Sequence, residues 1–230
     1  MSKLFLLALS LLLATAAHAQ LGLRAGGSLS GQITNPWQHL SGGNSLSTSS
    51  QLGYQLGITY RLPLSRHWAL VPELQFSRER ELASIRGYDP TLSSQADYRL
   101  NLSYLNVPVL LRLALGPVYL EAGPQASLLV GGRGQGTLTY SGPGASVITY
   151  DPVIDQAATE RYQRFDAGAC VGIGVQLPAG LGLSVRAYQG LVAMERSDSY
   201  QAETIPHSSN KAYRQTVQGS LTYQLPSFTK

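Results

Sequence analysis

Apolar and polar residues alternate along most of this chain with a period of two. In residues 21–30, every second residue is Leu, Ala or Gly, and the residues between them are Gly, Arg or Ser. This period is typical of β-strands with one apolar and one polar face, because successive side chains point to opposite sides. We therefore expect eight strands, and no amphipathic helix is indicated after residue 20. The eight segments are residues 21–30, 52–62, 68–77, 100–113, 118–128, 164–177, 181–188 and 213–225.

The fourth segment breaks the alternation. Apolar residues follow one phase in residues 100–104 and the opposite phase in residues 105–113. A β-bulge near Tyr104 and Leu105 would shift the phase by one residue and restore a single apolar face. Pro108 is a further irregularity, because proline cannot donate to the hydrogen-bond ladder.

The connections between these segments alternate between long and short. Four are long and rich in Gly, Ser and other polar residues, and three are short and contain Pro63, Pro117 or Pro178. Outer-membrane barrels have long loops outside the cell and tight turns in the periplasm. The expected fold is all-β, an eight-stranded antiparallel up-and-down transmembrane β-barrel with both termini in the periplasm. The long connections are residues 33–50, 84–97, 133–160 and 196–211, and the short ones are residues 63–67, 116–117 and 178–180.

The N-terminal segment is typical of a secretory signal peptide. Lys3 supplies a positive charge, residues 4–13 are almost all apolar, and the segment ends in Ala-His-Ala. The apolar run is only about half of the ~20 residues that a spanning helix needs. We predict a signal peptide over residues 1–19, cleavage before Gln20, and one β-barrel domain over residues 20–230 in the outer membrane of a Gram-negative cell.

Composition and charge exclude some partners and chemistries. Loss of Lys3 lowers the formal net charge from +4 to about +3, and the remaining Lys and Arg residues form no run. A nucleic-acid surface needs clustered basic residues, so no nucleic-acid partner is expected. Cys170 is the only cysteine, which excludes an intramolecular disulfide, and we expect it to be buried and inert.

The polar face of the strands carries charges of both signs, which we expect to pair inside the barrel. Side chains can fill an eight-stranded barrel, so a closed, salt-bridged interior is the first interpretation. A narrow water-filled path is the second, because Gly168, Gly172 and Gly174 leave local room. The predicted interior charge network consists of Arg24, Arg61, Glu73, Arg112, Glu121, Arg164, Asp166 and Arg186.

No catalytic, cofactor or metal motif was found, and we do not expect an enzyme. Glu79 and Glu81 belong to the outer end of the barrel, where an outer-membrane protease would carry carboxylates. However, His39, His67 and His207 fall in separate loops or turns, with no motif around them.

Four segments carry a resemblance to a known family. They are residues 21–30 (LGLRAGGSLS), 104–112 (YLNVPVLLR), 165–174 (FDAGACVGIG) and 183–191 (LSVRAYQGL), of which 104–112 is the most specific. The chain resembles the PorT-like outer-membrane β-barrel proteins of the porin family. The resemblance implies contact with outer-membrane lipid and insertion by the barrel-assembly machinery, but no shared activity. Barrels of this type usually end in an aromatic residue, whereas Phe228 here is followed by two more residues.

Two functions are compatible with a membrane barrel. The first is a structural or surface-interaction scaffold with long extracellular loops, since binding residues often lie on loops of a rigid scaffold. Its longest loop, residues 133–160, together with Tyr162, would offer Tyr140, Tyr150 and Tyr162 as contacts for an extracellular ligand or protein. The second is a narrow passive pore for ions or small solutes.

A third function requires the opposite orientation of the strands. A soluble, lipocalin-like binder of apolar ligands would turn Tyr54, Ile58, Val171 and Ile173 toward the barrel interior. Alternation alone is compatible with either orientation. The alternating loop lengths and the family resemblance favour the membrane barrel.

Overall fold

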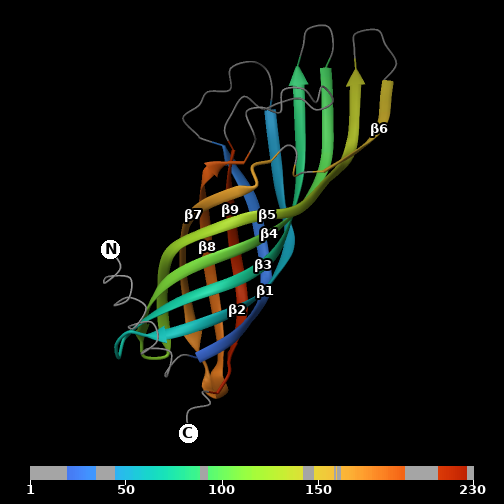
Figure 1. Cartoon of the computed structure of the whole chain (residues 1–230). Coiled ribbons are helices and arrows are strands. Elements are labelled where there is room, and N and C mark those ends of the chain that lie inside the picture. The colour runs from blue at the N-terminus through green and yellow to red at the C-terminus, as the bar shows by residue number, and fades with distance from the viewer. Residues whose placement is uncertain are drawn as a thin grey trace, which may run out of the picture.

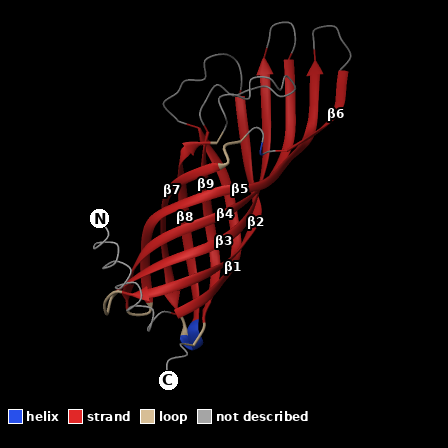
Figure 2. Ribbon diagram, in the orientation of Figure 1, coloured by secondary structure: helices blue, strands red, loops and turns tan. Residues whose placement is uncertain are grey.

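The computed structural model describes residues 20–34, 45–88, 93–141, 148–157, 159, 162–194 and 212–226. Nearly all of these residues belong to β-strands (Figure 2). Within these ranges, no helix is long and apolar enough to cross a membrane. The predicted signal peptide and Phe228 lie outside the described residues. The elements are β1 (Gln20–Thr34), β2 (Ser45–Pro63), β3 (Trp68–Tyr88), β4 (Ser93–Leu115), β5 (Val118–Ser141), β6 (Ile148–Ala157), β7 (Phe165–Gln176), the short helix η2 (Pro178–Gly180), β8 (Leu181–Ala193) and β9 (Ala212–Gln224).

Eight of these strands form a closed antiparallel barrel. The strand order is β4-β3-β2-β1-β9-β8-β7-β5, and β4 also pairs with β5, which closes the sheet on itself (Figure 1). Every barrel strand therefore has a partner on each side, so its backbone polar groups are hydrogen-bonded without water. The predicted eight-stranded antiparallel up-and-down barrel is confirmed.

The two ends of the barrel differ in their connections. The short turns β2–β3, β4–β5 and β7–β8 lie at one end, together with Gln20 and Gln224 (Figure 1). The opposite ends of the strands, including Thr34 of β1 and Ala212 of β9, lie at the other end of the barrel. Outer-membrane barrels keep their short turns in the periplasm, and we therefore name the two ends the periplasmic end and the outer end.

The barrel wall is polar on its inner face and apolar on its outer face. On β1, Arg24 is 2% exposed whereas Leu23 and Leu29 are each 50% exposed. The soluble, lipocalin-like interpretation is therefore wrong, because it needs the apolar face inside. The residues it would place inside, Tyr54, Ile58, Val171 and Ile173, are 43%, 47%, 56% and 52% exposed.

The irregularity predicted in β4 lies on β5 instead. Tyr104 pairs with Leu129 and Ser103 pairs with Gly131, which leaves Val130 without a partner on β4. In β4 itself, every second residue from Leu100 to Arg112 is buried, in one unbroken phase. A register shift does occur beside Tyr104, near the predicted position, but the extra residue is on β5, so the predicted change of phase within β4 was wrong. Its premise fails because apolar side chains face inward near the outer end of β4.

The strands extend farther than the alternation predicted. The connection expected over residues 84–97 is mostly strand, and the loop expected over residues 133–160 contains the end of β5 and all of β6. We call these outward extensions of β2, β3, β4 and β5, together with β6, the outer sheet. Figure 1 shows it continuing beyond the barrel. The outer sheet consists of residues 45–51, 80–88, 93–101, 133–141 and 148–157.

Close strand packing makes one inward-facing glycine essential to the barrel. A Cβ atom added at Gly123 on β5 would meet the carbonyl oxygen of Val109 on β4. By contrast, a Cβ added at Gly219 on β9 would meet nothing within 4 Å. The two positions therefore provide a matched pair for testing the closure of the barrel.

We expect Gly123→Ala to destabilise the barrel by about 1–3 kcal/mol, because the β4–β5 ladder must shift to admit the methyl group. Gly219→Ala should leave stability unchanged. Urea unfolding in lipid vesicles, followed by the heat-dependent shift of the folded band on gels, measures both. Equal stability of the two variants would contradict this account of the β4–β5 contact.

Candidate functional site

Five charged side chains from five strands meet in the periplasmic half of the barrel. We call them the lower charge cluster, and each is buried, at 2–6% exposure. It holds three guanidinium groups and two carboxylates, so it carries an excess of one positive charge. Its members are Arg24 (β1), Glu73 (β3), Arg112 (β4), Glu121 (β5) and Arg186 (β8).

Arg186 is the centre of this cluster. Its Nη1 and Nη2 donate to the two carboxylate oxygens of Glu73 at 2.6 and 2.7 Å. Its Nε donates to Oε1 of Glu121. The other oxygen of Glu121 accepts from Arg112 Nη2 at 3.0 Å, and the Arg112 guanidinium lies 3.9 Å from the ring centroid of Tyr119. Arg186, on β8, thus reaches across the barrel to Glu73 on β3, four strands away in the closed order, and also binds Glu121 on β5.

Arg24 is held more loosely than the other members. Its Nη1 lies 3.9 Å from Oε1 of Glu73. Among the described residues, none accepts a hydrogen bond from its guanidinium group. Arg24 is therefore stabilised chiefly by the charge of Glu73, which it shares with Arg186.

A second group, the upper charge cluster, lies nearer the outer end and consists of Glu79, Asp166 and Arg214. Arg214 donates through Nε to Glu79 at 3.0 Å, and its Nη1 lies 3.6 Å from Asp166. Tyr188 donates its hydroxyl to Asp166 at 2.8 Å. The Arg214 guanidinium also lies 3.9 Å from the ring centroid of Tyr104. Aromatic rings and carboxylates together enclose this buried cation.

Apolar residues fill the space beside and beyond the charge clusters. Cys170 is buried against Leu110 and Tyr188, as expected for an inert thiol. At the outer mouth, buried apolar residues come from β4 and β5, from the residue after β8, from the first residue of β9 and from the segment before β7. We call them the apolar plug. Its residues are Leu100, Leu102, Leu129, Tyr162, Met194 and Ala212.

The room expected beside three strand glycines is occupied. A Cβ at Gly172 would lie 2.8 Å from Cγ of Arg186, and a Cβ at Gly174 would meet the ring of Tyr119. At Gly168 it would meet backbone of Gln189. These glycines accommodate neighbouring side chains and backbone, so they do not widen a path through the barrel.

The structure brings together most of the predicted interior network. Arg24, Glu73, Arg112, Glu121 and Arg186 form the lower charge cluster, and Asp166 lies in the upper one. The remaining two predicted residues are placed differently.

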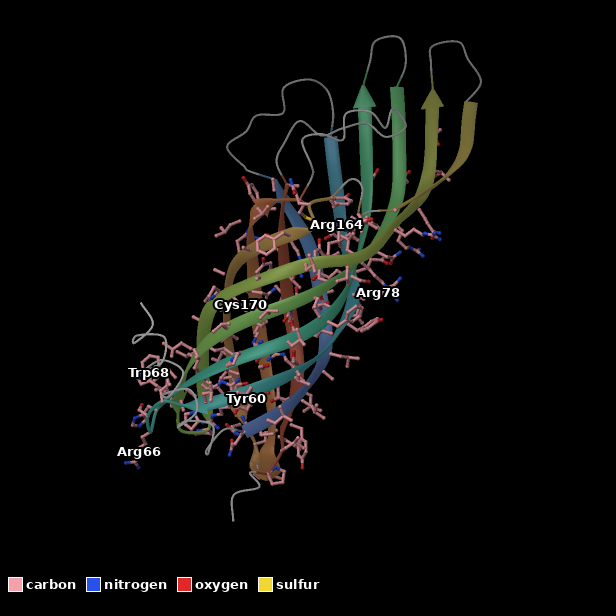
Figure 3. All side chains as sticks on the ribbon, in the orientation of Figure 1. Tyr60, Arg66, Trp68, Arg78, Arg164 and Cys170 are labelled. Atoms are coloured by element: carbon pink, nitrogen blue, oxygen red, sulfur yellow. The ribbon has the colours of Figure 1, made fainter. Side chains whose placement is uncertain are left out.

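Arg61 is half-buried at the periplasmic mouth, where it lines a pocket of about 450 Å³ with Gln20, Gln176 and Gln224. Arg164 is exposed at the outer end of the barrel (Figure 3), so its assignment to the interior network is wrong. It directly precedes β7, and alternation does not extend reliably beyond the end of a strand.

The predicted interior network did not include Arg214, Glu79 or Glu81, although the two glutamates were correctly expected toward the outer end of the barrel. All three side chains are buried, and Arg214 forms an ion pair with Glu79. Counting by twos from Glu73 through Gln75 would have placed both glutamates on the inner face of β3. Arg214 likewise shares the inner face of β9 with Thr216 and Gln218.

The three tyrosines predicted as surface contacts differ in their environments. Tyr162 is 3% exposed, so its predicted role as a surface contact is wrong. Tyr140 and Tyr150 lie on the paired strands β5 and β6 of the outer sheet. Among the described residues, no group of His, Cys, Asp and Glu is arranged to hold a metal ion.

A closed barrel with charges inside and leucines outside belongs to the outer-membrane class of transmembrane β-barrels. Residues 15–194 match the family model described as "Outer membrane protein beta-barrel domain". The chain belongs to this family and is an outer-membrane protein in contact with lipid.

Comparison with solved structures finds small outer-membrane barrels. Neisserial surface protein A (NspA) is 12% identical, with a TM-score of 0.47, over 90% of this chain and 99% of that one. Ail, the attachment invasion locus protein of Yersinia pestis, is 12% identical, with a TM-score of 0.39, over 90% and 99%. OprG from Pseudomonas aeruginosa is 10% identical, with a TM-score of 0.40, over 90% and 96%. No curated protein matches the sequence.

We expect Arg186→Met to destabilise the barrel by about 3–5 kcal/mol, because it leaves Glu73 and Glu121 buried without their closest cation. The matched control is Arg164→Met, whose exposed side chain should contribute within about 0.5 kcal/mol. Urea unfolding in vesicles compares the two. Similar midpoints would mean that the lower charge cluster contributes little to stability.

Proposed function

We propose that this protein is a surface-interaction scaffold, whose barrel anchors the outer sheet outside the cell for binding to an extracellular macromolecule. The length of its strands carries the proposal. β4 and β5 have 23 and 24 residues, whereas a tilted strand crosses a membrane with about 9–11. The extra length is paired strand, which indicates a rigid platform beyond the membrane.

The edge of the outer sheet supports this proposal. Among the described pairings, β6 pairs only with β5, and residues 45–51 of β2 pair only with β3. Strands with one unpaired side can accept a strand from a partner through backbone hydrogen bonds. Tyr140 and Tyr150 belong to the paired strands β5 and β6 beside one of these edges.

The filled interior also supports a scaffold over a pore. The lower charge cluster, the upper charge cluster and the apolar plug occupy successive levels between the periplasmic and outer ends. Paired buried charges hold opposite walls together, as Arg186 on β8 does with Glu73 on β3. A barrel closed in this way is suited to anchoring the outer sheet rather than to conducting solutes.

A closer kinship with the PorT-like proteins is part of the proposal. It is supported by residues 104–112 (YLNVPVLLR), which lie in β4 and supply Tyr104 and Arg112 to the two charge clusters. We further propose that residues 1–19 direct export and are then removed, and that the barrel-assembly machinery inserts the chain. We do not propose that this chain takes part in secretion.

Removal of the β5–β6 hairpin tests the scaffold directly. Arg133 and Ala157 are paired, so an Asn-Gly turn can replace residues 134–156 and close the shortened hairpin. Cells producing the wild type should adhere to at least one of a defined set of surfaces: fibronectin, collagen, heparin and a layer of sister cells. The shortened variant should lose that adhesion, because the binding edge is gone.

The gel shift of the unboiled variant serves as the control for an intact barrel. A folded variant that adheres as the wild type does would contradict the proposal. So would a wild type that adheres to none of these surfaces.

Bilayer recording separates the scaffold from the passive pore. We expect the folded protein to give no stepwise conductance in planar bilayers, because side chains close the barrel at several levels. Conductance steps that change with Arg112→Gln or Arg186→Gln would instead establish the pore.

A further inference from the structure

Charged side chains are segregated between the inside and the outside of this barrel. Of the six acidic residues whose side chains the structure describes, only Asp97 is exposed. The arginines are divided differently, because several lie on the outer wall near the outer end. Four of them, on three neighbouring strands, form what we call the arginine belt. Its members are Arg78 and Arg80 on β3, Arg99 on β4 and Arg133 on β5, all exposed.

The strand registers place the belt arginines next to one another. Arg80 lies opposite Asn101, and Asn101 lies opposite Arg133 on its other side. Adjacent strands are about 4.8 Å apart, so the Arg80 and Arg133 backbones are about 10 Å apart across the sheet. Arg99 lies on the same face of β4, two residues before Asn101 and nearer the outer end. The belt is therefore one continuous basic surface.

The bulge in β5 contributes to this surface. Inward-facing residues of β5 run from Tyr119 to Leu129 in steps of two. Continued without interruption, the same steps would turn Arg133 into the barrel. The unpaired residue Val130 shifts the phase, so Arg133 faces outward beside Asn101. Bulges commonly redirect side chains in this way.

The belt lies at the outer edge of the apolar band. On β3, outward residues from Trp68 to Phe76 are apolar, and Arg78 follows directly. At ~3.4 Å per residue and a tilt of about 40°, this stretch covers about 21 Å of the membrane normal, close to the ~25 Å of such bands.

Aromatic residues mark the same edge. The rings of Tyr54 and Phe76 lie 6.4 Å apart on the outer wall, and Tyr54 pairs with Arg78. Figure 3 shows Arg78 and Arg164 toward the outer end, with Tyr60 and Trp68 toward the opposite end. Aromatic girdles sit at membrane interfaces, so the arginines begin at the level of lipid headgroups.

We propose that the arginine belt binds the phosphate groups of the phosphorylated glycolipid in the outer leaflet. Guanidinium groups bind phosphate through paired, charge-assisted hydrogen bonds, and several together at the headgroup level attract anionic lipid. Among the described side chains, the belt's four guanidinium groups have one exposed carboxylate near them, that of Asp97, farther out on β4. The belt adjoins the base of the β5–β6 hairpin, where Arg133 pairs with Ala157, and the three arginines changed in the test lie on β3 and β4.

The test uses the protein purified in detergent and diphosphoryl lipid A as the probe. A variant with Arg78→Gln, Arg80→Gln and Arg99→Gln should bind lipid A about 10- to 100-fold more weakly than the wild type. The same three positions changed to Lys should retain most of the binding. Arg66→Gln, in the exposed periplasmic turn, should bind as the wild type does. Native mass spectrometry counts the bound lipid, and the gel shift confirms folding.

Lipid chemistry identifies the source of the phosphate. The wild type should bind dephosphorylated lipid A at least tenfold more weakly than diphosphoryl lipid A. Equal binding of the two, equal binding by the glutamine variant, or equally tight binding of cardiolipin would each overturn the proposal. None of these outcomes depends on adhesion, so the belt can fail while the scaffold stands.

Discussion

The pairing of β4 with β5 is the contact on which the rest of the structure depends. It converts a row of strands into a closed cylinder, so that no backbone N–H or C=O at membrane depth is left without a partner. Closure then decides what each side chain meets. Residues of one phase face hydrocarbon and must be apolar, while those of the other phase are enclosed with little water. The charges of the inner phase are stable only when paired, which is why Arg186 contacts both Glu73 and Glu121.

The enclosed charges explain why the same barrel makes a good anchor and a poor channel. The ion pairs of Arg186 with Glu73 and of Arg214 with Glu79 join strands that are distant around the wall, so they add cross-links to those of the sheet. The apolar plug at the outer mouth places Leu100 and Leu102 where a channel would need polar groups. Rigidity and closure thus follow from one arrangement, and the outer sheet can project from a base that does not deform.

Much of this fold could be predicted from the sequence, because the two faces of each strand meet different surroundings. Lipid outside the barrel and the polar interior impose the alternation of apolar and polar residues. Within the membrane the rule held, and it placed Arg24, Glu73 and Arg186 together correctly. Alternation failed as a guide at the outer end of the barrel, where lipid outside the wall is replaced by water. Leu100 and Leu102 face inward above the membrane, so their phase was misinterpreted as a bulge. The strands of the outer sheet lie in water, so they need no apolar face. Without an alternation of apolar and polar residues, β6 was predicted to be a loop.

Such a failure of alternation is itself informative. In β5, the unpaired Val130 is the last exposed apolar residue before Arg133. On β3, the change from Phe76 to Arg78 occurs at the same level, where the β2–β3 pairing shifts register between Gln51 and Tyr54. A change in outward chemistry on neighbouring strands therefore marks the membrane boundary, and the register shifts beside it. The interruption of the pattern locates the interface, and the arginines that follow it show which charge the chain presents there.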